Sequence, residues 1–178
     1  MTPVRLRNIT LSLMLTVPSV AVFAGGSQAS SHGHDGYAIG EPGKASQVTR
    51  TINIDMTDNM RFSVADIAVK QGETLRFVVK NLGLVKHEMV LGTETELKQH
   101  YELMKKNPEM EHADDNMLSV APGKTGEVIW RFSKAGKVDF ACLQPGHYDA
   151  GMKGMVTVAG AGAGAGVSKS DGHGSHKH

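Results

Sequence analysis

The residues of this chain best suited to chemistry are a cysteine, a histidine and a methionine in the segment FACLQPGHYDAGMKG, residues 140–154. Cys142 is the only cysteine of the sequence; four residues separate it from His147, and four more separate His147 from Met152. A second histidine, His87, lies far upstream in VKHEMVLG. A thiolate, two imidazoles and a weak axial thioether are the ligands that suit copper in an electron-transfer site. The pattern predicts one metal site, built from a distant strand and a single loop.

Each of these side chains also has an ordinary structural explanation. Met152 could fill the core, Cys142 could be a buried, inert thiol, His87 could end a strand and His147 could cap a turn. However, a single cysteine excludes an internal disulfide, and a free exposed thiol is prone to oxidation in an oxidising compartment. The combination of all these residues at this spacing therefore favours a metal site over separate structural roles.

Two segments, NLGLVKHEMVLG and FACLQPGHYDAGMKG, give the chain its resemblance to a known family. Over residues 48–158 it resembles the cupredoxins, the plastocyanin/azurin family of type 1 copper proteins, and among them the periplasmic copper-tolerance cupredoxins of the CopI type. The resemblance implies copper as the cofactor, with His87, Cys142, His147 and Met152 as its ligands. One residue departs from the pattern: Glu88 stands where many cupredoxins have Asn, which puts the hydrogen bonding to the cysteine sulfur in question.

The elements that must position these ligands are predicted to be short strands. Leu75, Phe77 and Val79 alternate with polar residues, as in a half-buried strand, and turn residues separate several segments of this kind. The predicted fold is an all-β, antiparallel Greek-key β-sandwich, which is the cupredoxin fold, with one short helix inserted between strands. Seven or eight strands are expected, in the segments Val48–Met56, Ile67–Lys70, Leu75–Lys80, His87–Leu91, Met117–Val120, Glu127–Phe132, Val138–Cys142 and Gly154–Val158.

The inserted helix is expected over residues 93–107. Thr93 and Glu96 have the spacing of a capping box, and the helix ends at Asn107 before a proline. An apolar stripe at helical spacing is predicted from Leu97, His100, Tyr101 and Met104.

The termini predict export and flexible ends. Residues 1–24 combine two arginines, an apolar run and small residues before a cleavage point, which indicates a cleaved signal peptide and a periplasmic protein without a membrane span. Residues 25–47 are expected to form a flexible arm with His32 and His34, residues 48–158 the cupredoxin domain, and residues 159–178 an Ala/Gly linker with a His-rich tail. Both ends could bind metal or be plain solvated tails. Removal of residues 1–24 changes the formal charge from +1 to −1, which argues against nucleic acid as a partner.

Methionines outside the main motif predict an accessory copper site. Thioethers select Cu(I), and the alternative is that these residues simply pack in the core. The candidate residues are Met104, Met110, His112 and Met117 in one segment and Met56 and Met60 in another.

The function that these features favour is an exported one-electron carrier with a role in copper tolerance. We expect a monomer whose partners are a redox protein or Cu(I) ions. Two alternatives remain open at this point: a cuprous oxidase that uses the accessory site, and a passive copper buffer or chaperone. The pattern favours electron transfer over enzyme catalysis.

Overall fold

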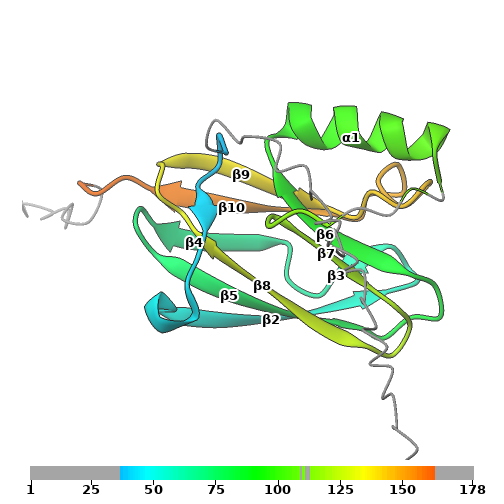
Figure 1. The fold of residues 1–178 in the computed structure, drawn as a ribbon, viewed down its shortest axis with the longest axis horizontal. Helices are drawn as coiled ribbons and strands as arrows, with labels where there is room; N and C mark the ends of the chain where they lie inside the picture. Colours follow the sequence, from blue (N-terminus) through cyan, green and yellow to red (C-terminus); the bar gives the residue numbers. More distant parts are fainter. Residues whose placement is uncertain (1–36, 109, 111–112, 163–178) are drawn as a thin grey trace, which may run out of the picture. The chain divides into compact units, whose positions relative to one another are not determined.

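The computed structural model describes residues 37–108, 110 and 113–162 of the chain. Within these residues, ten strands form two five-stranded sheets packed as a sandwich, with one α-helix on its outside (Figure 1). The predicted all-β sandwich with one inserted helix is confirmed. In spatial order the first sheet contains β1 (Glu41–Pro42), β8 (Thr125–Arg131), β5 (Thr74–Asn81), β2 (Arg50–Thr57) and β3 (Arg61–Phe62). The second contains β4 (Asp66–Lys70), β10 (Lys153–Ala159), β9 (Gly136–Ala141), β6 (His87–Gly92) and β7 (Met117–Val120).

The strand directions differ from the antiparallel arrangement expected. Strand β2 runs parallel to β5, and β4 runs parallel to β10, whereas the other paired strands are antiparallel. Between β2 and β5 the chain crosses to the second sheet as β4 and then returns, so β5 lies beside β2 in the same direction. Alternation of side chains is identical in the two kinds of ladder, so the sequence pattern could not separate them.

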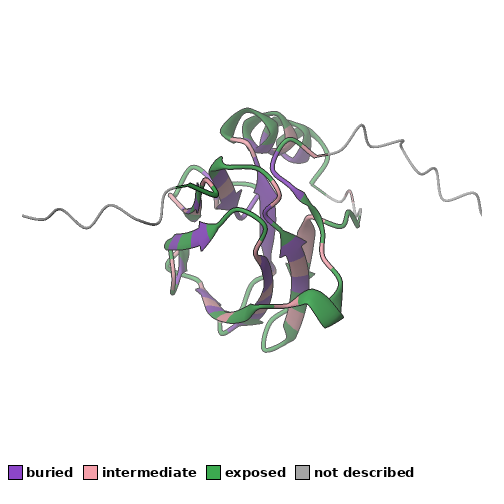
Figure 2. Ribbon diagram, turned by 90° about the vertical axis from the view of Figure 1, so that its left-hand side faces the viewer, coloured by how far each residue is buried: buried purple, intermediate pink, exposed green. Residues whose placement is uncertain are grey.

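The core lies between the two sheets, where the inward faces of the strands meet. Phe77, Trp130 and Phe140 are fully buried there, and Phe62 packs edge-to-face on Phe140 with ring centroids 5.1 Å apart. Figure 2 shows the same alternation along the strands, with buried segments interrupted by exposed ones. Each fully buried large apolar side chain contributes about 1.5–3 kcal/mol to folding, so this core holds both sheets in a fixed relation.

The helix α1 (Glu94–Lys106) connects β6 to β7 and begins with the predicted capping box, in which Thr93 and Glu96 satisfy each other's backbone amides. Its buried residues are Leu97, Tyr101 and Met104, whereas His100, which was expected in the same stripe, is only half-buried. These side chains form a second apolar cluster with Val90, Ala141, Leu143 and Tyr148 from the second sheet and the loop that follows β9. The helix therefore covers the outer side of the second sheet next to the predicted ligand loop (Figures 1 and 2).

Residues before position 48 also pack against the sandwich. Ile39 is buried in the main core and its carbonyl accepts a hydrogen bond from Trp130 Nε1 at 3.3 Å. Strand β1 pairs with β8, and a 3-10 helix, η1 (Ala45–Gln47), follows it. A strand of two residues has too little alternation to be recognised from the sequence, which predicts only a flexible arm there. His32, His34 and the tail from residue 163 lie outside the described residues. Of the helices in the described residues, none has the length and apolar character needed to cross a membrane.

Candidate metal centre

The predicted ligands lie together at one end of the second sheet. His87 is the first residue of β6, and Cys142 directly follows the last residue of β9. Val90 pairs with Ala141 across these two antiparallel strands, and this register places His87 and Cys142 at the same end. His147 lies in the loop between β9 and β10, and Met152 directly precedes β10.

Three donor atoms converge at this point. The Nδ1 atoms of His87 and His147 lie 4.0 Å and 3.3 Å from Cys142 Sγ, so both imidazoles turn the same nitrogen toward the sulfur. The donor atoms of these residues all lie within 4.8 Å of one another, and the two rings are tilted by 50° with centroids 4.9 Å apart. One sulfur and two imidazole nitrogens around a small space are the trigonal ligand set of a type 1 copper site.

Met152 is placed by the backbone of the same loop. Its carbonyl accepts a hydrogen bond from Cys142 N at 3.0 Å, and its amide donates to the His147 carbonyl at 3.1 Å. The side chain is fully buried in the main core, in the same cluster as Cys142. Its role as axial ligand stays a prediction, consistent with this position.

Burial divides the candidate ligands into an inner and an outer group. His87, Cys142 and Met152 are fully buried, whereas His147 is half-buried and forms the solvent edge of the site. Burial raises the pKa of the Cys142 thiol to about 12, although amide hydrogen bonds from Gln144 and Glu88 oppose this. Burial lowers the pKa of His147 below its ordinary value, and repulsion from the neighbouring His87 lowers it further. In the metal-free protein a neutral thiol and a neutral imidazole therefore face each other, and a metal must displace the thiol proton to bind sulfur.

Glu88, which stands where many cupredoxins have Asn, still donates a hydrogen bond to the cysteine sulfur. Its backbone amide donates to Cys142 Sγ at 3.3 Å, a bond that does not depend on the side chain. The side chain is buried and its Oε1 accepts a hydrogen bond from Gln144 Nε2, which ties β6 to the ligand loop. Residue 88 therefore keeps a backbone contact to the sulfur with Glu as its side chain.

Several residues that support the loop were not predicted from the sequence. Arg61 donates to the Ala150 carbonyl at 2.8 Å from the first sheet. The Tyr101 hydroxyl accepts a hydrogen bond from Gly146 N at 3.0 Å and donates to Asp149 Oδ2 at 2.7 Å. These contacts join residues 45 to 89 positions apart, and no local pattern in a single sequence marks them.

Asp58, in the turn between β2 and β3, contacts the site directly. Its Oδ1 lies 3.0 Å from His87 Nε2. Hydrogen bonds from the Leu84 amide and from His87 lower the pKa of this carboxyl below its ordinary value. Asp58 is therefore a carboxylate that accepts the Nε2 proton of His87.

The candidates for the accessory site are distributed over two different clusters. Met56 is fully buried in the main core, and Met60 packs against that core while partly buried. Met104 is buried in the second cluster, between the helix and the second sheet, and the partly buried Met117 packs against the same cluster. Met110 is half-buried, and His112 lies outside the described residues. Core packing accounts for Met56 and Met104, and the accessory copper site stays a prediction.

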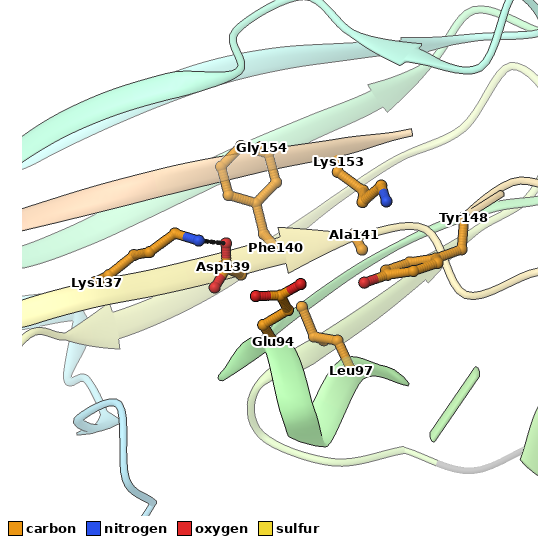
Figure 3. A pocket seen from close by; sticks show the side chains of 9 residues that line it. All are labelled: Glu94, Leu97, Lys137, Asp139, Phe140, Ala141, Tyr148, Lys153 and Gly154. Atoms are coloured by element: carbon orange, nitrogen blue, oxygen red, sulfur yellow. Dashed lines mark ion pairs between the residues drawn. The ribbon is translucent and has the colours of Figure 1, made fainter. Parts of the chain in front are cut away.

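The structure also contains a cavity of about 190 Å³ between the start of α1 and strands β9 and β10 (Figure 3). Lys137 and Asp139 form an ion pair of 2.9 Å on its wall, and Lys153 lies over the Tyr148 ring, 4.1 Å from its centroid. None of the predicted copper ligands lines this cavity, so it is separate from the metal centre.

A β-sandwich with a buried thiol and two converging imidazoles is the arrangement of a small blue-copper protein. Residues 48–159 match the family described as copper binding proteins, plastocyanin/azurin family, and the chain belongs to this family. Its cofactor is copper. The solved structures similar to it include the dithionite-reduced auracyanin of Roseiflexus castenholzii, with a TM-score of 0.54 and 25% identity over 63% of this chain and 98% of that one.

The chain is also similar in sequence to curated copper-resistance proteins. The chain is 48% identical to the copper-resistant cuproprotein CopI of Rubrivivax gelatinosus, over 75% of this chain and 82% of the relative. It is 36% identical to the copper-resistant cuproprotein CopI of Pseudomonas aeruginosa, over 78% of this chain and 92% of the relative. The resemblance stated from the two sequence motifs is confirmed.

Proposed function

We propose that this chain is an exported type 1 copper protein that carries single electrons and serves copper tolerance. The observation that carries the proposal is the convergence of Cys142 Sγ with the Nδ1 atoms of His87 and His147 within 4.8 Å. Met152 is assigned as the weak axial ligand. The name shared by the relatives, copper-resistant cuproprotein, supports the role in tolerance.

Bound copper supplies a one-electron Cu(II)/Cu(I) couple at this site. The protein contributes donors that are already gathered and a loop whose movement is restricted. Arg61, Tyr101 and Glu88 each hold a different part of that loop by a hydrogen bond. Ligands held in this way change position little between the two oxidation states, which keeps the reorganisation cost of electron transfer low. The half-buried ring of His147 is the proposed route for electrons to and from a redox partner.

The proposed location is the periplasm, reached through the signal peptide at residues 1–24. The mature chain is proposed to act as a monomer, with Cu(I) ions or a redox protein as its partner. The histidines in residues 25–47 and 159–178 are proposed to take part in metal capture.

The test is the visible and EPR spectrum of the purified mature protein after addition of Cu(II). A thiolate bond to copper gives an intense visible band that disappears on reduction with ascorbate, together with the EPR signal of one copper per chain. Cys142→Ser is the matched control, because it keeps the size of the side chain and removes the sulfur. A wild-type sample that stays colourless with Cu(II) contradicts the proposal.

The same preparation separates the two alternative functions. A passive buffer or chaperone binds copper without a band that responds to reductant. A cuprous oxidase consumes oxygen when Cu(I) is supplied, and its accessory site retains Cu(I) in the Cys142→Ser variant. Absence of Cu(I) binding in that variant rules out the accessory site.

A further inference from the structure

The imidazole of His87 has two nitrogens, and the structure gives each a different neighbour. Nδ1 lies 4.0 Å from Cys142 Sγ, on the side where copper binds in the proposed site. Nε2 lies 3.0 Å from Asp58 Oδ1, and the side chain of His87 is fully buried. A buried ring N–H requires a protein acceptor, because water does not reach it. Asp58 provides that acceptor.

Asp58 is itself held in place by the loop that precedes β6. Its second oxygen, Oδ2, accepts a hydrogen bond from Leu84 N at 2.7 Å. Gly83 gives the carboxylate its room, since a Cβ atom at that position would lie 1.9 Å from Oδ1. The carboxylate belongs to the turn between β2 and β3 of the first sheet, whereas His87 begins a strand of the second. The contact therefore links the two sheets at the metal centre.

We infer that Asp58 is a positioning residue for copper, one that fixes the ring of His87 with its Nδ1 lone pair directed at the metal and favours Cu(II) over Cu(I). The first effect follows because a carboxylate that accepts the Nε2 proton selects the tautomer whose Nδ1 is free to bind. The second follows because a negative charge next to a ligand stabilises the more highly charged metal ion. This inference rests on the proposed function, since it assigns the tuning of that same site.

Three variants separate the parts of this role. Asp58→Asn removes the charge and keeps an oxygen that can accept the Nε2 proton. Asp58→Ala removes both. Gly83→Ala keeps Asp58, but its added methyl group displaces the carboxylate, which is the free end of a side chain and can move without unfolding the strand. Glu41→Gln is the control, since it removes one negative charge from an ion pair with Arg131 on β1 and β8.

The first measurement uses nitrogen-15 NMR of the His87 ring in the full mature protein without metal. The wild type is expected to show a proton on Nε2 alone, as are Asp58→Asn and Glu41→Gln. Asp58→Ala and Gly83→Ala are expected to show a mixture of tautomers. A single Nε2–H tautomer in both of these variants overturns the inference.

The second measurement is made on the copper-loaded protein. Asp58→Ala is expected to lower Cu(II) affinity about 10- to 100-fold in competition with a chelator. Asp58→Asn is expected to raise the reduction potential more than Glu41→Gln does, with the thiolate band retained. Equal potentials in these two variants overturn the inference. A wild type without a thiolate band defeats the proposed function instead, while the ring tautomer of the metal-free protein still decides what Asp58 does.

Discussion

At the scale of single residues, the site combines side chains whose ordinary ionisation has been changed by burial. Cys142 is fully buried, and the resulting loss of hydration raises the pKa of its thiol to about 12. A thiol in an unfolded chain has a pKa of about 8.5. Folding of the metal-free protein therefore keeps a proton on sulfur over a range of pH in which the unfolded chain loses it.

This difference predicts a loss of stability with rising pH in the metal-free protein. Below pH 8 the thiol is protonated in both states, so its contribution to stability is fully present. As the pH rises from about 8.5 toward 12, the unfolded state loses its proton first, and the free energy of unfolding falls by about 1.4 kcal/mol per pH unit.

Urea denaturation of the wild type and of Cys142→Ser at pH 7, 9, 10 and 11 measures the effect. The serine variant contains no thiol, so other titrating groups act equally on both proteins and the difference between them isolates Cys142. Parallel pH profiles for the two proteins would contradict the assigned pKa.

At the scale of elements, the helix α1 is a support for the ligand loop. Tyr101 on this helix contacts the loop twice, through Gly146 N and Asp149 Oδ2, and its ring packs 5.1 Å from the ring of Tyr148. Lys105 lies above the Tyr101 ring at 5.2 Å from its centroid. The helix thus fixes the segment that carries His147 from the side opposite to the core.

Removal of the Tyr101 hydroxyl should loosen this connection. We expect Tyr101→Phe to lower the free energy of unfolding by about 1–2 kcal/mol, because a partly buried amide and a carboxylate lose their common partner. The thiolate band should remain but become broader. Tyr148→Phe is the matched control. The Tyr148 ring belongs to the same aromatic pair, and its hydroxyl borders the cavity in Figure 3. Equal stability of the two variants would argue against a supporting role for α1.

Strand β10 must approach the core closely to carry the loop back into the second sheet. A Cβ atom on Gly154 would lie 2.1 Å from the Phe140 ring and 2.7 Å from the Ala65 carbonyl. We expect Gly154→Ala to cost about 1–3 kcal/mol of stability in thermal or urea unfolding. Neither neighbour can move easily, because the Phe140 ring is packed in the core and the Ala65 carbonyl is part of the backbone. Gly160→Ala is the control, as its Cβ would lie 3.7 Å from the nearest atom, Ala135 Cβ. A Gly154→Ala variant as stable as this control would contradict the tight packing.

At the scale of the whole molecule, the sequence was informative where the chemistry is local and uninformative where it is not. The alternation around Phe77 and the capping box at Thr93 are properties of short segments, and each predicted its element. The spacing after Cys142 is also local, and the structure brings Cys142 and His147 together with His87. Asp58 and Arg61 act on residues 29 and 89 positions away, so only the folded chain brings them into contact. The parallel pairing of β2 with β5 could not be predicted for the same reason, because the direction of pairing depends on contacts between distant segments.

The sandwich as a whole gathers the donors before any metal binds, which predicts that the metal-free protein is folded. The donor atoms of His87, Cys142 and His147 already lie within 4.8 Å of one another, and the core around them consists largely of apolar side chains from both sheets that bind no metal. We expect far-ultraviolet circular dichroism to be unchanged when copper is removed. At a free copper concentration about 100 times the dissociation constant, binding should add about 2.7 kcal/mol of stability and raise the Tm by at least 5 °C. The Cys142→Ser variant should lose most of this increase while it keeps the same spectrum, since it lacks the sulfur and retains the sandwich. A metal-free chain without β-structure would show instead that copper, and not the packed sheets, organises the fold.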